Sequence, residues 1–265
     1  VLRNPGALIS LARLKTADDY TYMHSVAVCA LMIALARQLK LDDEQTYEAG
    51  MAGLLHDIGK MATPLDILNK PGRLTEAEFA IVKEHPVQGY EALKDSAGIS
   101  DIVRDVCLHH HERMDGSGYP DGLAGDQISL FARMGAVCDV YDAITSNRPY
   151  KKGWDPAKSL KHMASWGGKY FDPTIFNAFV KSVGIYPIGS FVKLDSGRLG
   201  VVVEPGEKSL LKPQVKVFFS AKSKTYITAE LLDLASPACN DRIASREDPE
   251  KWGIRDVERF WTNQV

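Results

Sequence analysis

The hydrophobic period of this 265-residue chain changes once, near Tyr186-Pro187. Before this point apolar residues recur every three or four positions, which is typical of helices that bury one face. After it, short β-branched and aromatic runs are separated by turns such as Asp195-Ser-Gly, which is typical of strands in a small sheet. The pattern predicts a mainly α-helical bundle over residues 1–184 and a small antiparallel β appendage with a charged tail over residues 185–265.

The same periodicity places the individual elements. Pro86 should bend the helix that precedes it, because proline removes a backbone hydrogen bond. The tail from Asn240 carries scattered aromatics, Trp252, Phe260 and Trp261, that we expect to pack back on the protein. Helices are expected at 24–41, 44–55, 75–85, 99–109, 129–146, 157–163 and 174–183, and strands at 191–194, 200–203 and 215–219.

Composition excludes several classes of protein. The chain is 45% hydrophobic and 25% charged, which is ordinary for a globular protein, and its net charge is −2. This charge gives no general attraction to nucleic acid or to an anionic membrane. No apolar run reaches the roughly 18 residues that a membrane-spanning helix requires. We therefore expect neither nucleic acid nor a membrane as a partner.

The four cysteines indicate a reducing compartment. Cys29, Cys107, Cys138 and Cys239 are widely spaced, form no Cys-x-x-Cys pair and lie mostly in apolar helical patterns. Reduced, buried thiols in the cytoplasm are the simplest interpretation. The start at Val1 resembles neither a signal peptide nor a natural initiator, so we expect a fragment of a longer protein whose N-terminal regulatory part is missing.

Histidines and aspartates at buried helix positions carry the chemistry. His56-Asp57 ends a strongly apolar helix, where both polar groups need partners that a metal ion would supply. His24 lies on the preceding helix and His85 at the expected bend, although each alone is more often a core histidine. Asp139 interrupts an apolar helix, where a carboxylate needs a nearby cation. The row His109 to His111 adds further imidazoles, and the residues alone do not decide which of them bind.

Helices that pack together would gather these side chains in a bundle core. Imidazole favours Fe, Mn, Ni or Zn over Mg or Ca, and a bridging carboxylate favours a pair of ions. Two metals roughly 3.5 to 4 Å apart can hold a bridging hydroxide and stabilise displacement at phosphorus. The ligand types therefore indicate phosphodiester hydrolysis.

Six segments in this order resemble the HD-GYP family, the subgroup of HD-superfamily metal phosphohydrolases that degrade cyclic-di-GMP. The resemblance covers about residues 18–183 and implies an HD-superfamily helical bundle. It implies hydrolysis of cyclic-di-GMP to linear pGpG, with further cleavage to GMP left open. The segments are YTYMHS (20–25), LLHDIGK (54–60), ILNKPGRLT (67–75), KEHPVQG (83–89), HHERMDGSGYPDGL (110–123) and CDVYDAITSNRPYKK (138–152).

The resemblance also assigns a metal centre with Asp57 as the bridging and catalytic carboxylate. It implies two divalent transition-metal ions, Fe or Mn first, with Ni or Zn as alternatives. Family members with a third metal carry a glutamate four residues before the first histidine, where this chain has Tyr20, so we predict two ions rather than three. The implied ligands are His24, His56, Asp57, His85, His110, His111 and Asp139.

Four further residues are predicted to serve the substrate. Lys60 follows Asp57 by one turn and would reach the scissile phosphate or the leaving oxygen, although an isolated lysine there is usually only solvated. Arg148 and Lys151 would hold the second phosphate of a cyclic dinucleotide, since arginine binds through a fork and lysine as a point charge. Asp142 would orient a ligand or Lys60 beside the substrate.

Gly118, Tyr119 and Pro120 form the GYP loop next to the predicted ligands. Glycine permits unusual backbone angles and proline fixes a turn, so the loop can pack closely beside the centre. Glu112, Arg113 and Asp115 would pin it through ion pairs, and His109 would remain a helix-end residue or stand behind a ligand. The resemblance implies docking of a diguanylate cyclase (GGDEF-type) domain on this loop, and a homodimer is left open.

Three alternative functions remain at this point. The same chemistry would serve another cyclic dinucleotide, such as 3',3'-cyclic GMP-AMP, because no base-reading residue is evident. A catalytically weak sensor acting through the GYP loop is a second alternative, which the intact ligand set disfavours. A general nucleotide triphosphate hydrolase of the HD superfamily would leave the GYP and RPYKK segments unused.

Overall fold

The computed structural model describes residues 19–146, 153–154, 156–206 and 209–260. The chain divides into two compact units, Val1–Ser182 and Val183–Val265. In the described residues the first is helical and the second carries a five-stranded antiparallel sheet. The predicted fold class, mainly α with a C-terminal antiparallel β part, is confirmed.

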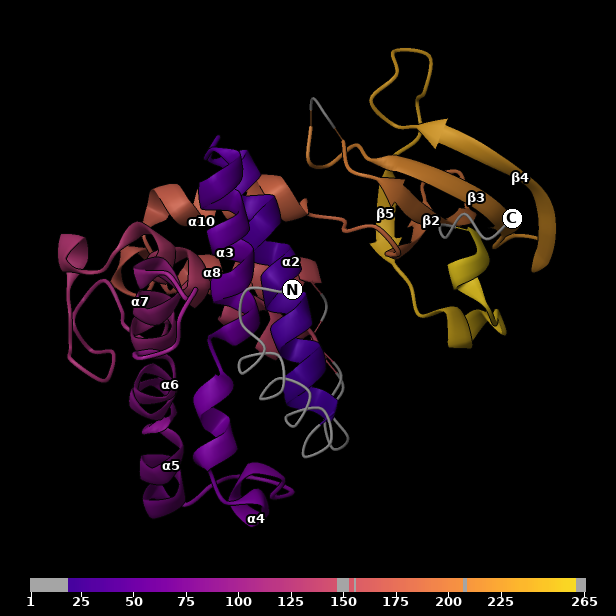
Figure 1. Cartoon of the computed structure of the whole chain (residues 1–265). Coiled ribbons are helices and arrows are strands. Elements are labelled where there is room, and N and C mark those ends of the chain that lie inside the picture. Colours follow the sequence, from indigo (N-terminus) through magenta and orange to yellow (C-terminus); the bar gives the residue numbers. More distant parts are fainter. Residues whose placement is uncertain (1–18, 147–152, 155, 207–208, 261–265) are drawn as a thin grey trace. The chain divides into compact units, whose positions relative to one another are not determined.

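The helical unit contains all the expected helices. Short 3₁₀ turns connect several of them, including one at Ile58–Ala62. The α-helices that Figure 1 labels or shows are α2 (Asp19–Gln38), α3 (Asp43–Leu55), α4 (Leu65–Leu68), α5 (Glu76–Val82), α6 (His85–Leu93), α7 (Asp101–His109), α8 (Leu130–Thr145), α9 (Pro156–Ser165) and α10 (Pro173–Val183).

Side-chain caps fix where the helices that carry the site begin. α3 starts with a capping box between Asp42 and Gln45, in which the Gln45 N–H donates to the Asp42 carboxylate at 2.8 Å. Ser100 and Ser129 accept a backbone N–H at the starts of α7 and α8. Such caps satisfy helix-end N–H groups that otherwise lack partners.

The expected bend at Pro86 is a break between two helices. α5 ends at Val82, and α6 begins at His85 with Pro86 in its first turn. Proline fits there because the first N–H groups of a helix have no intrahelical acceptor in any case. His85 therefore stands at a helix junction.

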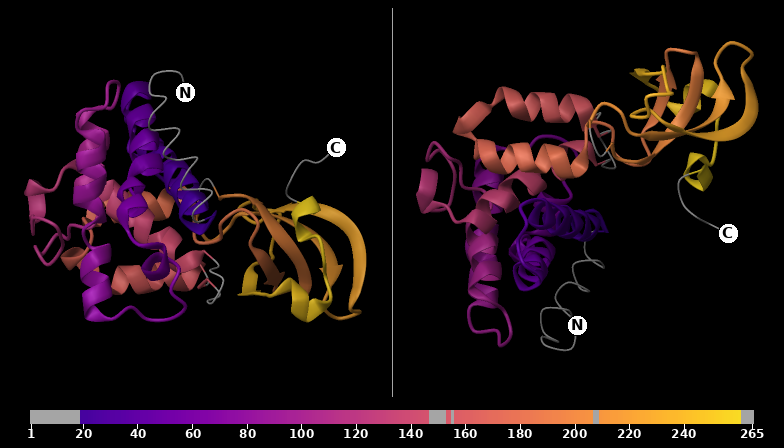
Figure 2. Two further views of the ribbon diagram at one scale, coloured as in Figure 1. Left: turned by 60° about the horizontal axis from the view of Figure 1, so that its bottom comes forward. Right: turned by 90° about the horizontal axis from the view of Figure 1, so that it is seen from above.

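Four helices enclose the core of the helical unit. α2 and α3 lie side by side, as Figures 1 and 2 show, α3 packs on α7, and α8 contacts both α7 and α2. Their facing side chains are fully buried and apolar, and they include Val28, Met32, Val106, Met134 and Val137. Within the described residues, no helix has the length and apolar character that crossing a membrane requires.

The second unit is built on one sheet in the order β4-β3-β2-β1-β5, with every neighbouring pair antiparallel. Each face carries its own apolar cluster, one around Phe218 and one around Val217. Trp252 and Phe260 pack on the first cluster; Trp261 lies outside the described residues. The strands are β1 (Phe191–Leu194), β2 (Arg198–Glu204), β3 (Gln214–Ser220), β4 (Thr225–Asp233) and β5 (Ile243–Arg246).

Candidate metal centre

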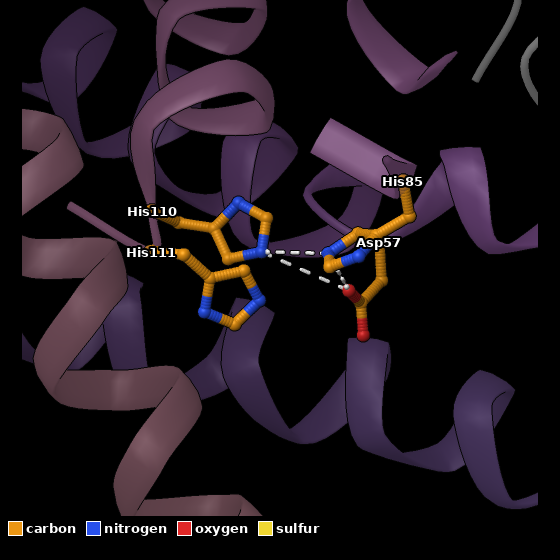
Figure 3. A group of neighbouring side chains, drawn as sticks. All are labelled: Asp57, His85, His110 and His111. Carbon is orange, nitrogen blue, oxygen red and sulfur yellow. Dashed lines mark hydrogen bonds and ion pairs between the residues drawn. The ribbon is translucent and has the colours of Figure 1, made fainter. Parts of the chain in front are cut away.

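The fold brings all seven predicted ligands together inside the helical unit. They come from α2, the end of α3, the start of α6, the residues after α7, and α8. Six are buried and His111 is partly exposed, with 22% of its side chain accessible. Figure 3 shows four of them, with the imidazoles of His85 and His110 directed at the Asp57 carboxylate.

The two oxygens of Asp57 face different sets of side chains. Oδ2 lies 3.3 Å from Nε2 of His56 and 3.6 Å from Nε2 of His24. Oδ1 lies 3.2 Å from Nε2 of His85 and 3.8 Å from Nε2 of His110. Donor atoms within 4.8 Å of one another form two groups, Asp57 with His24 and His56, and Asp57 with His85, His110 and His111. One carboxylate is thus shared by two sets of metal-type ligands.

Asp139 contacts both sets from α8. Its Oδ1 lies 2.9 Å from Nε2 of His24 and 3.9 Å from Nε2 of His56, and its Oδ2 lies 3.8 Å from Nδ1 of His111. A second carboxylate therefore lines the centre and contacts ligands of both sets.

Hydrogen bonds orient most of these imidazoles. Nδ1 of His56 donates to the Gly53 carbonyl at 2.8 Å, and Nδ1 of His85 donates to the Val82 carbonyl at 2.7 Å. His110 donates to the Val106 carbonyl at 3.0 Å. A carbonyl only accepts, so each bond fixes Nδ1 as the protonated nitrogen and leaves Nε2 as the ligand atom.

His24 is oriented by a carboxylate instead. Its Nδ1 lies 2.6 Å from Oδ2 of Asp142, which is 6% exposed and also accepts from the Ser146 hydroxyl. Asp142 therefore contacts His24, a predicted ligand, as the expected role of orienting a ligand requires. Arg148 and Lys151 lie outside the described residues.

The electrostatics favour a bound cation. Burial alone would raise the pKa of Asp57, but the charges of His56 and Lys60 outweigh it and hold that pKa well below its usual range. Burial lowers the pKa of His111 to about 3 and also lowers that of His110. At neutral pH Asp57 is therefore ionised and His110 and His111 are neutral, the states in which they bind metals.

His24 differs, because metal must compete with a proton there. Burial alone would lower its pKa, but hydrogen bonds to Asp139 and Asp142 outweigh burial and raise the pKa to about 9. In the metal-free protein His24 is thus a cation that partly neutralises the carboxylates. Metal binding to the His24 imidazole releases a proton, so the metal affinity rises with the pH.

Two buried polar atoms at the centre test whether the residues fit metal ions. Nε2 of His56 and Oδ1 of Asp57 have no hydrogen-bond partner among the described residues. Leaving such an atom unsatisfied costs about 1–3 kcal/mol, and buried polar groups are normally paired. One divalent ion held by each ligand set would satisfy both atoms, so the donor set fits the predicted centre.

Lys60 lies at the edge of this centre. Its ammonium donates to Oδ2 of Asp57 at 2.5 Å, and 20% of its side chain is exposed. It is thus a partly accessible cation beside the Asp57 carboxylate.

Glycines in the motif segments have a role that sequence reasoning missed. A Cβ at Gly59 would lie 1.9 Å from the His85 carbonyl oxygen and 2.4 Å from the Gly89 nitrogen. The turn after Asp57 therefore packs directly on the backbone of α6, which brings Asp57 to His85. The available signal was a glycine within LLHDIGK, since glycine often marks a close backbone approach.

The GYP loop is held by contacts other than the expected ion pairs. Glu112 accepts the N–H groups of Asp121 and Gly122, at the C-terminal end of the loop. The Asp115 carboxylate accepts the Ser117 N–H at 3.0 Å, at the N-terminal end of the loop. The Tyr119 ring stacks on His111 with centroids 4.7 Å apart. His109 turns away from the centre and binds Asp105 and Asp121, so it stays a helix-end residue.

Fold and centre together define a helical domain built around a buried histidine–carboxylate site for divalent metals. The sequence model of the HD domain family matches residues 5–175. The chain belongs to the HD domain family, and its resemblance to the HD-GYP group is confirmed.

Relatives of known name agree with this assignment. A protein of Pseudomonas aeruginosa named cyclic di-GMP phosphodiesterase is 63% identical over 99% of this chain and 63% of its own length. The cyclic di-GMP phosphodiesterase response regulator RpfG of Xanthomonas campestris is 45% identical over 65% of this chain and 47% of its own. The chain thus spans about half to two thirds of these relatives.

A solved structure supports the fold. An HDG"Y"P protein from Bdellovibrio bacteriovorus superposes with a TM-score of 0.50, covering 60% of this chain and 50% of that protein, at 24% identity.

Proposed function

We propose that this chain is a metal-dependent phosphodiesterase that opens cyclic-di-GMP to linear pGpG, with GMP as the product of any further cleavage. The observation that carries the proposal is the Asp57 carboxylate shared between two sets of buried histidines. The names of the two relatives, which are cyclic di-GMP phosphodiesterases, support the choice of substrate.

Two divalent ions, Fe or Mn first and Ni or Zn as alternatives, would be held by His24, His56 and Asp139 on one side of Asp57 and by His85, His110 and His111 on the other. When bound, such ions lower the pKa of an attacking water and neutralise charge on the phosphate. The chain's contribution is to hold the donor atoms in place. Carbonyls already fix Nδ1 of His56, His85 and His110, and Asp142 fixes Nδ1 of His24.

Lys60 would serve the chemical step directly. Its ammonium lies against Oδ2 of Asp57 and is partly accessible, so it can turn to a phosphoryl oxygen or to the leaving oxygen as negative charge develops there. A fixed cation at that point stabilises the transition state more than the ground state. Arg148 and Lys151 remain predicted contacts of the second phosphate.

The test is an anaerobic turnover assay of the whole chain loaded with Fe(II) or Mn(II). We expect chromatography to show loss of cyclic-di-GMP and formation of pGpG. The variant Asp57→Ala should be inactive, because it removes the donor common to both ligand sets. Asp101→Ala is the matched control, since Asp101 is a fully exposed aspartate on α7 whose ion pair among the described residues is with Arg104. Full activity of Asp57→Ala would refute the mechanism.

The same assay separates the alternatives. Faster turnover of 3',3'-cyclic GMP-AMP would reassign the substrate, and tight nucleotide binding without turnover would favour the sensor. Metal analysis should give two ions per chain, and three tightly held ions would contradict the prediction drawn from Tyr20. Cytoplasmic location, docking of a GGDEF-type domain on the GYP loop and a homodimer stay predictions; the free thiols of all four cysteines support the first.

A further inference from the structure

His109 and Glu112, which flank His110 and His111, both contact the C-terminal end of the GYP loop, at residues 121–122. Glu112 is 2% exposed, and its Oε1 accepts the N–H groups of Asp121 at 2.8 Å and Gly122 at 3.0 Å. His109 reaches the Asp121 carboxylate through Nε2 at 3.0 Å. In the row 109–112, His110 and His111 therefore face the centre, and His109 and Glu112 face the loop.

Tyr119, within the loop, contacts His111 in the same row of residues. The Tyr119 N–H donates to the His111 carbonyl at 3.3 Å, and the Tyr119 ring stacks on the His111 imidazole at 4.7 Å with 25° between the planes. Gly118 makes this return possible, because a Cβ there would lie 2.5 Å from Cα of Glu112. Glu112 thus contacts the C-terminal end of this short loop, and His111 contacts Tyr119 within it.

His111 depends on this stack for its orientation. Among the residues that the structure describes, its ring makes no hydrogen bond to a helix carbonyl of the kind that fixes His56, His85 and His110. Its ring neighbours are His110, the Tyr119 face and His85, whose centroid lies 5.0 Å away. Oδ2 of Asp139 lies 3.8 Å from Nδ1 of His111, which is too long for a hydrogen bond. A ligand without a hydrogen-bonded partner needs packing to hold it.

We propose that Glu112 is a positioning residue for His111: it closes the GYP loop through the backbone of Asp121 and Gly122, so that Tyr119 stacks on His111 and holds that imidazole at the metal site it forms with His85 and His110. The inference rests on the two-metal centre of the proposed function. It assigns the buried glutamate a task at one of the two ligand sets and not at the other.

The experiment measures Mn²⁺ affinity by titration calorimetry of the full chain in two backgrounds. His56→Ala disables the set with His24 and leaves the set with His111, whereas His85→Ala does the reverse. Adding Glu112→Ala should weaken Mn²⁺ binding on the order of 10- to 100-fold in the first background, which is typical for loss of a residue behind a ligand. In the second background the affinity should not change. Glu112→Gln keeps the Oε1 acceptor without the charge and should give a smaller loss.

A double-mutant cycle tests whether Glu112 acts through Tyr119. In the His56→Ala background, Tyr119→Ala should weaken Mn²⁺ binding as Glu112→Ala does, and the double variant should lose little more, because both changes remove the same stack. The control is Asp115→Ala, since Asp115 also accepts a loop N–H but on the exposed side, and it should bind as its parent does.

Far-UV circular dichroism verifies the fold of each variant, and Tyr119→Ala with Glu112→Gln carries the test if Glu112→Ala is unfolded. Equal losses in the two backgrounds, or additive losses in the cycle, would overturn the inference alone. A wild-type chain that binds no Mn²⁺ would overturn the two-metal proposal and the inference with it.

Discussion

Gly59 offers the sharpest test of how the fold builds the centre. The variant Gly59→Ala adds a single methyl group, which would lie 1.9 Å from the His85 carbonyl oxygen and 2.9 Å from Cα of Gly89. Both contacts are backbone atoms of α6, so no flexible side chain can move aside. The turn after Asp57 and the start of α6 must separate, and His85 must move away from Oδ1 of Asp57.

Overpacking a core by a methylene or more costs about 1–3 kcal/mol when neighbours can adjust, and we expect the upper end here because backbone must shift. For a unit of this size, about 3 kcal/mol corresponds to a fall in Tm of about 6–12 °C. Differential scanning calorimetry of the metal-free chain measures it. Mn²⁺ titration should also show weaker binding at the set with His85.

The matched control is Gly168→Ala. A Cβ there would meet Cγ of Pro173 at an ordinary 3.5 Å, so the unfolding free energy should stay within about 0.5 kcal/mol of wild type. A Gly59→Ala chain with the Tm and metal affinity of wild type would show that the turn and α6 are not in backbone contact, and the reasoning would fail.

Three further changes probe other parts of the chain. Lys60→Ala should lower kcat on the order of 10²-fold with the metal content unchanged, as turnover assays and metal analysis would show; loss of metal instead would make Lys60 a structural residue. Ser129→Ala removes the acceptor of the Ala132 N–H and should cost about 1 kcal/mol in urea unfolding, whereas an unchanged midpoint would deny the cap its role. Burial would raise the pKa of Asp241, but hydrogen bonds from Ser196 and Arg198 outweigh burial and hold it below the usual value. A carboxyl whose pKa is lower in the folded state stabilises the fold above its unfolded pKa of about 3.9, and this contribution is lost as the pH falls through the folded pKa. Asp241→Asn should therefore make the urea midpoint depend less on pH below about pH 4. Identical acid limbs would count against the Arg198 pair.

Some of the candidate ligands could be predicted from the sequence because a polar group stands where the pattern demands an apolar one. Asp139 stands within a buried stretch of α8, and His56-Asp57 follows the apolar end of α3. Neither position tolerates an unpaired polar side chain. The free-energy cost of burying these polar groups thus made them recognisable in the sequence. The resemblance to the HD-GYP family selected His110 and His111 from a row of three.

Other features left no such mark in the sequence. β4 is exposed along most of its length and β5 has only four residues, so neither shows the alternation that reveals a half-buried strand. The roles of Gly59 and Glu112 depend on backbone that arrives from later in the chain, namely α6 and residues 121–122. Contacts of this kind are set by tertiary packing, which local pattern does not encode.

Helix ends explain why histidines from separate parts of the chain can form one centre. The Nδ1 donors of His56, His85 and His110 are all accepted by carbonyls in the last turn of α3, α5 and α7. The last turn of a helix carries the negative end of the helix dipole and has carbonyls without intrahelical partners. The Val106 carbonyl also accepts the backbone N–H of His110. The same turn therefore orients each imidazole and favours a cation at its Nε2. His24 lies near the start of α2 and not at a helix end, and the buried carboxylate of Asp142 contacts its Nδ1 instead.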